Sequence, residues 1–352
     1  MNRAHATIER SALRKSDAGY VTMRRTLATC GALLILLICI VTVASVVGSE
    51  PLPLAHSLGA LFTFGNRAIG LTIEQRAILF EIRVPRVLLA AAVGASLAAA
   101  GAAYQALLRN PLAEPYLLGV SNGAAVGTMM ALVFFTRYEW SRPVMAFAGA
   151  LSATFIVYRL ARGRAGASPE RLILAGVIVT TFLSSLIVFI TALMDATRIR
   201  SFTFWLLGDL SGTTPNLLAV ALVGALIGTI ALMLNARSLN LLMLGERDAF
   251  DLGVEVERVR LRVFLGASLL VGASVAASGS VGYVGLVVPH LVRMSVGGDN
   301  RLTIPASALA GASFVVIADT LARTVIAPRE LPVGAITALV GAPLFIYLLR
   351  KR

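Results

Sequence analysis

The sequence predicts an all-α, polytopic integral membrane protein with about ten transmembrane helices and an inverted internal repeat. The chain has 352 residues, of which 57% are hydrophobic and only 14% are charged, whereas about 25% of the residues of a soluble domain are charged. Apolar runs close to the roughly 20 residues that a bilayer requires recur along the chain. This composition excludes a disordered, a collagen-like or an ordinary cytosolic protein.

The predicted elements divide the chain into a polar N-terminal segment, 1–26, and a single membrane domain, 27–352. The expected spans lie at about 27–48, 84–108, 117–136, 143–161, 171–194, 216–236, 259–279, 282–297, 303–322 and 333–349. The eighth is short and contains Pro289 and His290. The stretch Phe202–Leu210 is apolar but too short to cross a bilayer, so we interpret it as an interfacial or re-entrant piece.

The basic residues predict the orientation of these spans. The formal net charge is +13, from 31 Lys and Arg against 18 Asp and Glu. With ten spans, 21 of the 31 basic residues fall on the side of the two termini and 10 on the other side. The excess marks the cytoplasmic face, so both termini are expected in the cytoplasm. Because the arginines lie between apolar runs, they are interpreted as topology-setting flanks, and no nucleic-acid partner is expected.

Small residues indicate how the helices pack. Gly123 with Gly127 and Gly224 with Gly228 are G-x-x-x-G pairs, which allow close helix contact. Glycine is also common in membrane helices, so a single pair is not specific. Residues 93–119 and 271–297 share ten identities at an offset of 178, and the two copies would run in opposite directions. Low complexity inflates such a count, but inverted repeats are typical of transport proteins.

The sequence lacks the residues that ATP hydrolysis, a disulfide framework or a metal site would require. A phosphate-loop lysine could only be Lys15 or Lys351, and each follows an arginine and not a glycine. ATP hydrolysis is therefore expected on a separate polypeptide, and the chain is not expected to be an enzyme. Cys30 and Cys39 fit no disulfide framework or metal site. Asp319, the best intramembrane carboxylate for a coupled carrier, lies four residues before an arginine and is more simply explained by a local ion pair.

One long loop, about 237–260, separates the sixth and seventh spans and is the most charged internal segment. Gly245 and Gly253 are expected to divide it into two short helices. These helices could lie in the headgroup layer or bind a cytosolic partner. A lipid-facing helix is usually basic. Five of the 18 acidic residues fall between Arg237 and Arg262, so a protein partner is favoured.

Motifs throughout the chain resemble the permeases of the iron-complex and vitamin B12 class of ATP-binding-cassette importers. The matching stretches include IRVPRVLLAAAVGASLAAAGAAYQALLRNPLAEPYLLGVSNGAAVG at 82–127, WLLGDLSG at 205–212, LNLLMLGERDAFDLGV at 239–254, SGSVGYVGLVVPHLVR at 278–293 and PASALAGASFVVIADTLARTV at 305–325. The resemblance covers nearly the whole chain from the first span onward. It implies a transport subunit of the bacterial cytoplasmic (inner) membrane.

The resemblance also implies partners and cargo. The partners are a second copy of the chain, two cytosolic ATP-binding subunits, an extracytoplasmic substrate-binding protein and membrane lipid. ATP would be used by the partner ATPase, and no cofactor or metal would be bound by this chain. The cargo would be a bulky metal chelate, with a ferric siderophore preferred over haem or cobalamin. The alternative is a secondary transporter or exporter that works without an ATPase.

Site residues carried over from the family fall into three groups. The ATPase-coupling positions are Leu244, Gly245, Glu246, Asp248, Ala249, Leu252 and Gly253. The binding-protein docking positions are Arg83, Arg86 and Arg323, which could instead be interfacial anchors or, for Arg323, the partner of Asp319. The gate positions are Asn110, Pro111, Leu112, Ser168 and Pro169, whose prolines could simply end or begin helices.

Overall fold

The computed structural model describes residues 22–63, 70–135, 138, 140–163 and 166–350, and it contains ten apolar helices at the predicted spans. Seven are long enough to cross a membrane and three are shorter. They are α2 (Met23–Val46), α5 (Val84–Leu107), α6 (Val120–Phe134), α7 (Ser141–Ala161), α8 (Pro169–Leu193), α10 (Pro215–Leu234), α13 (Val256–Ser278), α14 (Val284–Val296), α15 (Asn300–Thr324) and α16 (Val333–Arg350). The all-α polytopic prediction is confirmed.

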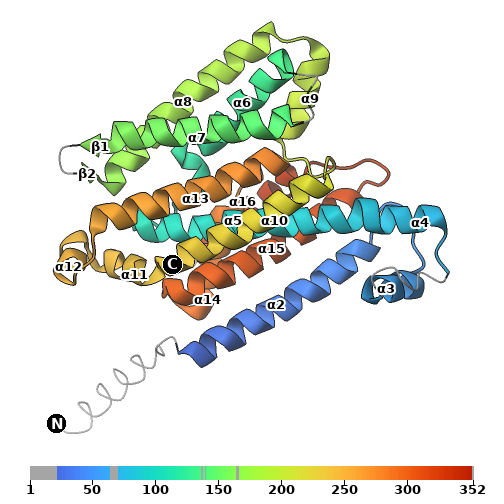
Figure 1. Ribbon diagram of the computed structural model, residues 1–352, viewed down its shortest axis with the longest axis horizontal. Coiled ribbons are helices and arrows are strands. Elements are labelled where there is room, and N and C mark those ends of the chain that lie inside the picture. The colour runs from blue at the N-terminus through green and yellow to red at the C-terminus, as the bar shows by residue number, and fades with distance from the viewer. Residues whose placement is uncertain (1–21, 64–69, 136–137, 139, 164–165, 351–352) are drawn as a thin grey trace.

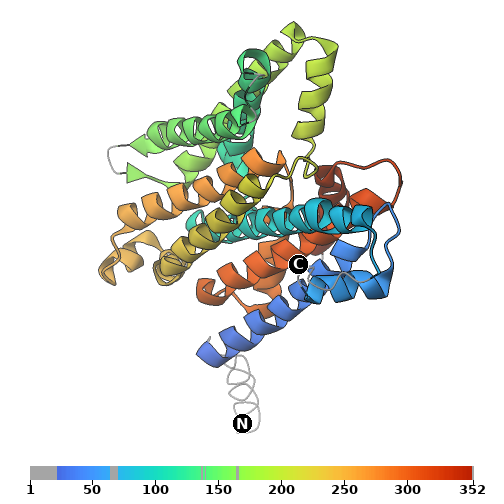
Figure 2. The same ribbon diagram turned by 45° about the vertical axis from the view of Figure 1, so that its right-hand side comes forward.

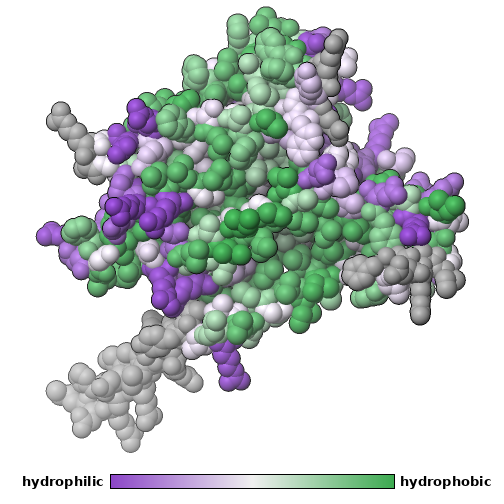
Figure 3. All heavy atoms as spheres, viewed as in Figure 1, coloured by the Kyte–Doolittle hydropathy of each residue, from purple (hydrophilic) through white to green (hydrophobic). Residues whose placement is uncertain are grey.

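Most of the shorter elements lie at the two ends of this bundle (Figure 1). The shorter elements are α3 (Leu54–Phe62), α4 (Ile73–Ala77), the π-helix η1 (Ile78–Arg83), the 3₁₀ helix η2 (Pro115–Leu118), the strands β1 (Arg162–Gly163) and β2 (Gly166–Ala167), α9 (Ala196–Leu206), α11 (Ala236–Leu244) and α12 (Glu246–Asp251). We name the ends of the bundle after α12 and α4, at the left and right of Figure 1. Figure 3 shows hydrophilic residues at both ends and a hydrophobic band between them, as expected of a protein that crosses a bilayer.

The second predicted span begins earlier than its sequence suggests. α4, η1 and α5 join into one helix of 35 residues, Ile73–Leu107. Thr72 begins it with a capping box, in which its side chain accepts from the Gln75 backbone N–H and the Gln75 side chain accepts from the Thr72 N–H. Pro85 lies inside this helix, directly after the π-helical turn. Such a turn changes the backbone hydrogen-bond pattern where proline cannot donate, so Pro85 does not end the helix here.

The core surrounds α5, which lies between α13 and α15 in both views (Figures 1 and 2). Of its 24 residues, 19 are buried. Near its α12 end the Tyr104 hydroxyl donates to the Phe264 carbonyl oxygen at 3.1 Å and lies 2.5 Å from the Ser268 hydroxyl. The central helix is therefore fixed by side-chain packing and by hydrogen bonds across to α13.

Glycine allows α6 and α7 to touch backbone to backbone. A Cβ on Gly127 would lie 1.9 Å from the Met145 carbonyl oxygen, and Gly123 faces the same helix nearly as closely. The predicted Gly123–Gly127 packing pair is confirmed. The Gly224–Gly228 pair behaves differently, because a Cβ on Gly224 would meet nothing within 4 Å and only Gly228 packs, on a leucine side chain.

We expect Gly127→Ala to destabilise the bundle and Gly224→Ala to leave its stability nearly unchanged. The first substitution forces a methyl group into backbone, which costs about 1–3 kcal/mol, whereas the second fills open space on a helix and removes the helix penalty of glycine. Thermal unfolding of both purified variants in detergent measures the difference. Equal unfolding midpoints would show that the α6–α7 contact is not tight.

The two copies of the sequence repeat keep their predicted opposite directions. α5 runs from the α4 end to the α12 end and α13 runs back (Figure 1). Gly101 lies inside α5, but Gly279, its counterpart in the repeat, ends α13 with φ +68°. A Cβ on Gly279 would also lie 1.9 Å from the Trp205 carbonyl oxygen. The two copies therefore have the opposite directions that the repeat predicts, but their local structures differ from Gly101 and Gly279 onward.

Candidate functional site

Two short helices form the loop between α10 and α13 at the α12 end. Gly245 separates α11 from α12 with φ 147° and ψ 153°, a backbone conformation open essentially to glycine alone. Gly253, with φ 84°, follows α12 and precedes α13. The predicted breaks at both glycines are confirmed, and they fold the loop into a helix pair.

Large apolar side chains are exposed on this helix pair. Leu244, Phe250 and Leu252 are 68%, 71% and 61% exposed, and we call these three residues the α12 patch. Ala249, between them in sequence, is fully buried, so one face of α12 is anchored to the bundle while the patch points outward. Glu246 and other charged residues surround the patch, which places it outside the hydrocarbon region. An apolar patch exposed among charges is typical of a protein-binding surface.

Ion pairs hold α12 against the first turns of α13. The Glu246 carboxylate lies 2.6 Å from the Arg260 guanidinium and 3.5 Å from that of Arg109. Arg260, whose side chain is only 5% exposed, also contacts Glu257 at 3.1 Å. Arg109 belongs to the loop after α5 and has φ 50°, so Glu246 connects the α11–α12 pair to that loop.

A second set of polar contacts ties α11 to α15. The Asn240 side chain donates to Asp299 at 2.7 Å and accepts from the Asn300 backbone N–H at 2.8 Å. Burial alone would raise the pKa of Asp299, but hydrogen bonds from Arg301 and Asn240 outweigh it and lower the pKa. This carboxylate is therefore ionised at neutral pH and can accept from both partners.

The two predicted gate segments lie at the beginnings and ends of helices. In the first, the Asn110 side chain accepts from the Leu112 backbone N–H at 2.9 Å, which closes a turn around Pro111 directly after Arg109. In the second, Ser168 is the N-cap of α8, its hydroxyl accepting from the Arg171 N–H at 3.4 Å, and Pro169 is the first residue of the helix. Helix-terminal roles therefore account for the geometry of both segments, and gating stays a prediction.

A buried ion-pair cluster occupies the α4 end. Asp319, fully buried on α15, lies 3.0 Å from the Arg86 guanidinium and 3.0 Å from that of Arg323. Arg86 also contacts Glu330 at 2.8 Å. The local Asp319–Arg323 pair considered from the sequence is therefore present, and it is shared with a second arginine.

Two of the arginines fix the end of α2. Arg83 donates to the Val46 carbonyl oxygen at 2.6 Å, and Arg323 donates to the Ala44 carbonyl oxygen at 3.2 Å. The last carbonyls of a helix lack intrahelical partners, and an arginine can satisfy them. α2 is otherwise among the least buried of the apolar helices, with 6% of its most apolar window buried. These contacts hold a peripheral helix to the bundle.

The structure brings the three predicted docking residues together but buries them. Arg83 and Arg323 are 4% exposed and Arg86 is 8% exposed. Of these three arginines, only Arg86 lines a cavity of about 240 Å³, together with Phe204 and Glu330. Docking stays a prediction for all three, and Arg86 is the residue that a molecule at this end could approach.

Sequence reasoning missed Glu330 as a member of this cluster. It lies in the loop before α16, 244 residues away from its partner Arg86 in the chain. No periodicity or motif spacing connects residues so far apart in the chain. Only the packing of α5 beside α15 reveals the contact.

Nearly the whole membrane domain matches a known transport family. Residues 33–351 match the FecCD transport family.

The chain belongs to the FecCD family.

A cobalamin import system permease protein, BtuC of Halobacterium salinarum, is 38% identical over 93% of this chain and 97% of its own. The hemin transport system permease protein HmuU of Yersinia pestis is 43% identical over 78% and 84%. A solved structure described as an inward-facing metal-chelate type ABC transporter aligns with a TM-score of 0.81 at 31% identity, covering 92% of this chain and 99% of that chain. The predicted family resemblance is confirmed.

Proposed function

We propose that this FecCD protein is the transmembrane permease subunit of an ATP-binding-cassette importer for a bulky metal chelate. The observation that carries the proposal is the α12 patch, whose exposed Leu244, Phe250 and Leu252 stand on a helix pair tied to α13 and α15. An apolar surface anchored to the bundle in this way can receive force from a partner and pass it to the helices. The relatives named for cobalamin and hemin transport support the same reading.

The proposed assembly contains two copies of this chain, two cytosolic ATP-binding subunits on the α12 patches and a substrate-binding protein at the α4 end. The α12 end then faces the cytoplasm of a bacterial cell, with both termini on that side, in agreement with the excess of basic residues predicted there. ATP is bound and hydrolysed by the partner subunits. This chain provides the path and the gates.

A contact chain supports how such a partner could act on the path. Movement of α12 would shift Glu246, which contacts Arg109 directly beside the Asn110–Leu112 turn and Arg260 on α13. One carboxylate thus connects the α12 patch to a proposed gate and to a helix beside the central α5. The two permease copies would rock between states whose relative populations the bound ATPase sets.

Reconstitution tests the proposal against its alternative. The chain is placed in liposomes with its ATPase subunits and binding protein, and uptake of the chelate is followed with ATP, without ATP and with only a proton gradient. The proposal expects uptake that requires ATP and the binding protein. Uptake by the chain alone, driven by the proton gradient, would support the secondary transporter instead.

The cargo within the chelate class is tested on the binding protein. We propose a corrinoid or haem compound on the names of the relatives, and a ferric siderophore stays a prediction from the sequence. Titration of the purified binding protein with cobalamin, haem and a ferric siderophore, followed by absorbance or calorimetry, ranks the three. Binding of none of them would remove the chelate class.

Docking at the α4 end is tested by a charge-balanced variant. Arg86→Met with Glu330→Gln removes one charge of each sign and leaves the Arg323–Asp319 pair intact. We expect the affinity for the binding protein to fall about tenfold, as for loss of one well-placed charged contact, while the permease stays folded. Arg198→Met, which removes an exposed arginine of α9, is the control. Unchanged affinity in the double variant would exclude Arg86 from the docking surface.

A further inference from the structure

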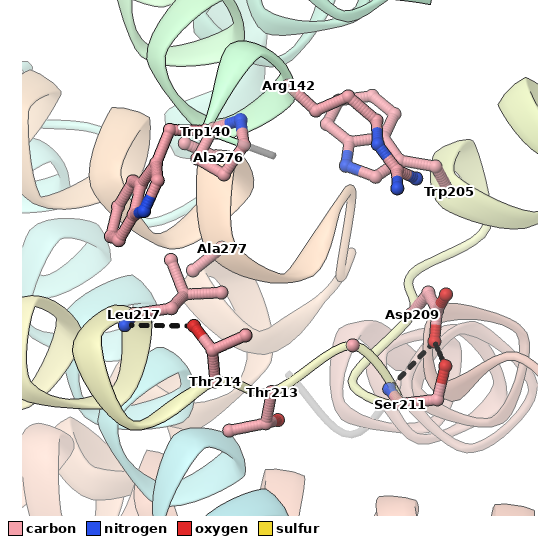
Figure 4. Close-up of a pocket in the computed structure, with 12 residues that line it drawn as sticks. Trp140, Arg142, Trp205, Asp209, Ser211, Thr213, Thr214, Leu217, Ala276 and Ala277 are labelled. Atoms are coloured by element: carbon pink, nitrogen blue, oxygen red, sulfur yellow. Dashed lines mark hydrogen bonds between the residues drawn. The ribbon is translucent and has the colours of Figure 1, made fainter. Parts of the chain in front are cut away.

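A cavity of about 410 Å³ opens at the α4 end between α7, α9, α10 and α13 (Figure 4). Trp140 and Trp205, the only tryptophans of the chain, both line it. Trp140 is 39% exposed, whereas Trp205 is 8% exposed. Tryptophan is enriched where a protein meets the boundary between lipid tails and headgroups, because its ring is apolar and its N–H is polar. The position of the cavity therefore corresponds to a headgroup layer.

An apolar crevice of about 210 Å³ continues from this cavity along the helices. It shares Trp140 and Leu217 with the cavity and is lined deeper by Phe147 of α7, Val220 of α10 and Ala273 of α13. These residues lie within the apolar spans. α10 is exposed over most of its surface, with only 11% of its most apolar window buried, so the crevice opens on an exposed apolar wall. Its surroundings suit a hydrocarbon chain.

The polar part of the cavity carries one charge of each sign. Arg142 lies in the first turn of α7, is exposed, and has no carboxylate partner among the residues that the structure describes. Asp209 lies across the cavity on the loop between α9 and α10, where its carboxylate accepts from the Ser211 backbone N–H at 2.8 Å and from the Ser211 hydroxyl at 2.6 Å (Figure 4). A ligand for this cavity therefore needs an anionic group, a cationic group and an apolar tail.

We propose that the cavity and crevice together bind one aminophospholipid from the leaflet at the α4 end. Its phosphate lies at Arg142, its primary ammonium donates to Asp209, and one acyl chain fills the crevice beside Phe147. Phosphatidylethanolamine has this arrangement of charges and can donate hydrogen bonds from its ammonium. Phosphatidylglycerol has no cation for Asp209, and the choline group of phosphatidylcholine cannot donate a hydrogen bond. The proposal needs only that the chain spans a membrane and is independent of its transport partners.

The fluorescence of the two tryptophans that line the cavity can report lipid binding. The full chain is reconstituted in phosphatidylcholine nanodiscs, and phosphatidylethanolamine with brominated acyl chains is titrated in while tryptophan fluorescence is recorded. We expect saturable quenching, with an apparent affinity about fivefold higher than for brominated phosphatidylglycerol or phosphatidylcholine, the ratio that one exposed ion pair provides. Asp209→Asn should remove this preference, and the asparagine can still accept from Ser211. Arg142→Gln should weaken the binding of all three lipids, because each carries a phosphate.

Arg198→Gln, on an exposed arginine of α9 that does not line the cavity, is the matched control and should retain the preference. Quenching that follows only the mole fraction of brominated lipid, whatever its headgroup, would overturn the proposal. So would an unchanged headgroup preference in the Asp209 variant, or unchanged lipid affinity in the Arg142 variant. Circular dichroism of each variant confirms that it is folded before titration.

Discussion

Phe250→Asp is expected to abolish ATP-dependent uptake while leaving the permease folded. The ring of Phe250 is 71% exposed at the centre of the α12 patch, so its removal costs little within the chain itself. If an ATPase subunit buries that ring, a carboxylate in its place must be desolvated without a partner, which costs several kcal/mol. Buried aromatic anchors typically contribute 2 kcal/mol or more to an interface. We expect uptake below about one tenth of the wild-type rate.

The measurement has two parts, co-purification of the ATPase subunits with the tagged permease and uptake in liposomes. Phe62→Asp is the control, because it makes the same change at a 74% exposed phenylalanine of α3, at the opposite end of the bundle. It should retain the ATPase subunits. Normal co-purification and uptake by the Phe250 variant would exclude the α12 patch as the coupling surface, whatever the identity of the cargo.

Sequence reasoning located the membrane helices well because each depends on its own composition. Both ends of every predicted span lie within four residues of the ends of the corresponding helix. The span predicted at 259–279, for example, corresponds to α13 at Val256–Ser278. The helices that the sequence did not predict are those whose composition does not distinguish them from loops. The helix through Ile73–Arg83 is too polar to span, and a π-helical turn before Pro85 lets it continue. α3 is likewise short and peripheral, with no periodicity long enough to reveal it.

The candidate sites were predicted less evenly. Gly245 and Gly253 were recognised because a glycine break depends on local backbone freedom. Whether an arginine faces water or the interior depends instead on distant residues. Arg83 and Arg323, for which docking stays a prediction, donate to carbonyls of α2, and Arg86 shares Asp319 with Arg323. Family motifs indicate which residues matter, but burial and long-range partners define what each can do.

The α12 and α4 ends differ in how their charges are held, and this predicts where the fold is most sensitive. At the α12 end the side chains of Arg109 and Glu246 are 37% and 39% exposed, so water screens their ion pair and it contributes little to stability. Such contacts can break and re-form as a coupling element requires. At the α4 end Asp319 is fully buried between two arginines, and the same kind of interaction becomes structural.

Asp319→Ala is therefore expected to lower the free energy of unfolding by about 3–5 kcal/mol, the cost of breaking a buried ion pair from one side. Arg323 would be left buried without a counter-ion, and Arg86 would keep only Glu330. Replacing Asp319 with Asn together with Arg323→Met removes both charges of one pair and should recover most of the loss.

Asp251→Ala, which removes an exposed carboxylate of α12, is the control and should change stability by less than about 0.5 kcal/mol. Thermal unfolding in detergent ranks the four proteins. Similar midpoints for the Asp319 and Asp251 variants would mean that the two arginines find other partners or water, and the α4-end cluster would then not be what holds α2 and α15 together. A large loss of stability that the double variant rescues would instead show that Arg86 and Arg323 mainly stabilise the fold. A binding protein at this end would then have to contact Arg86 and Glu330, which line the cavity.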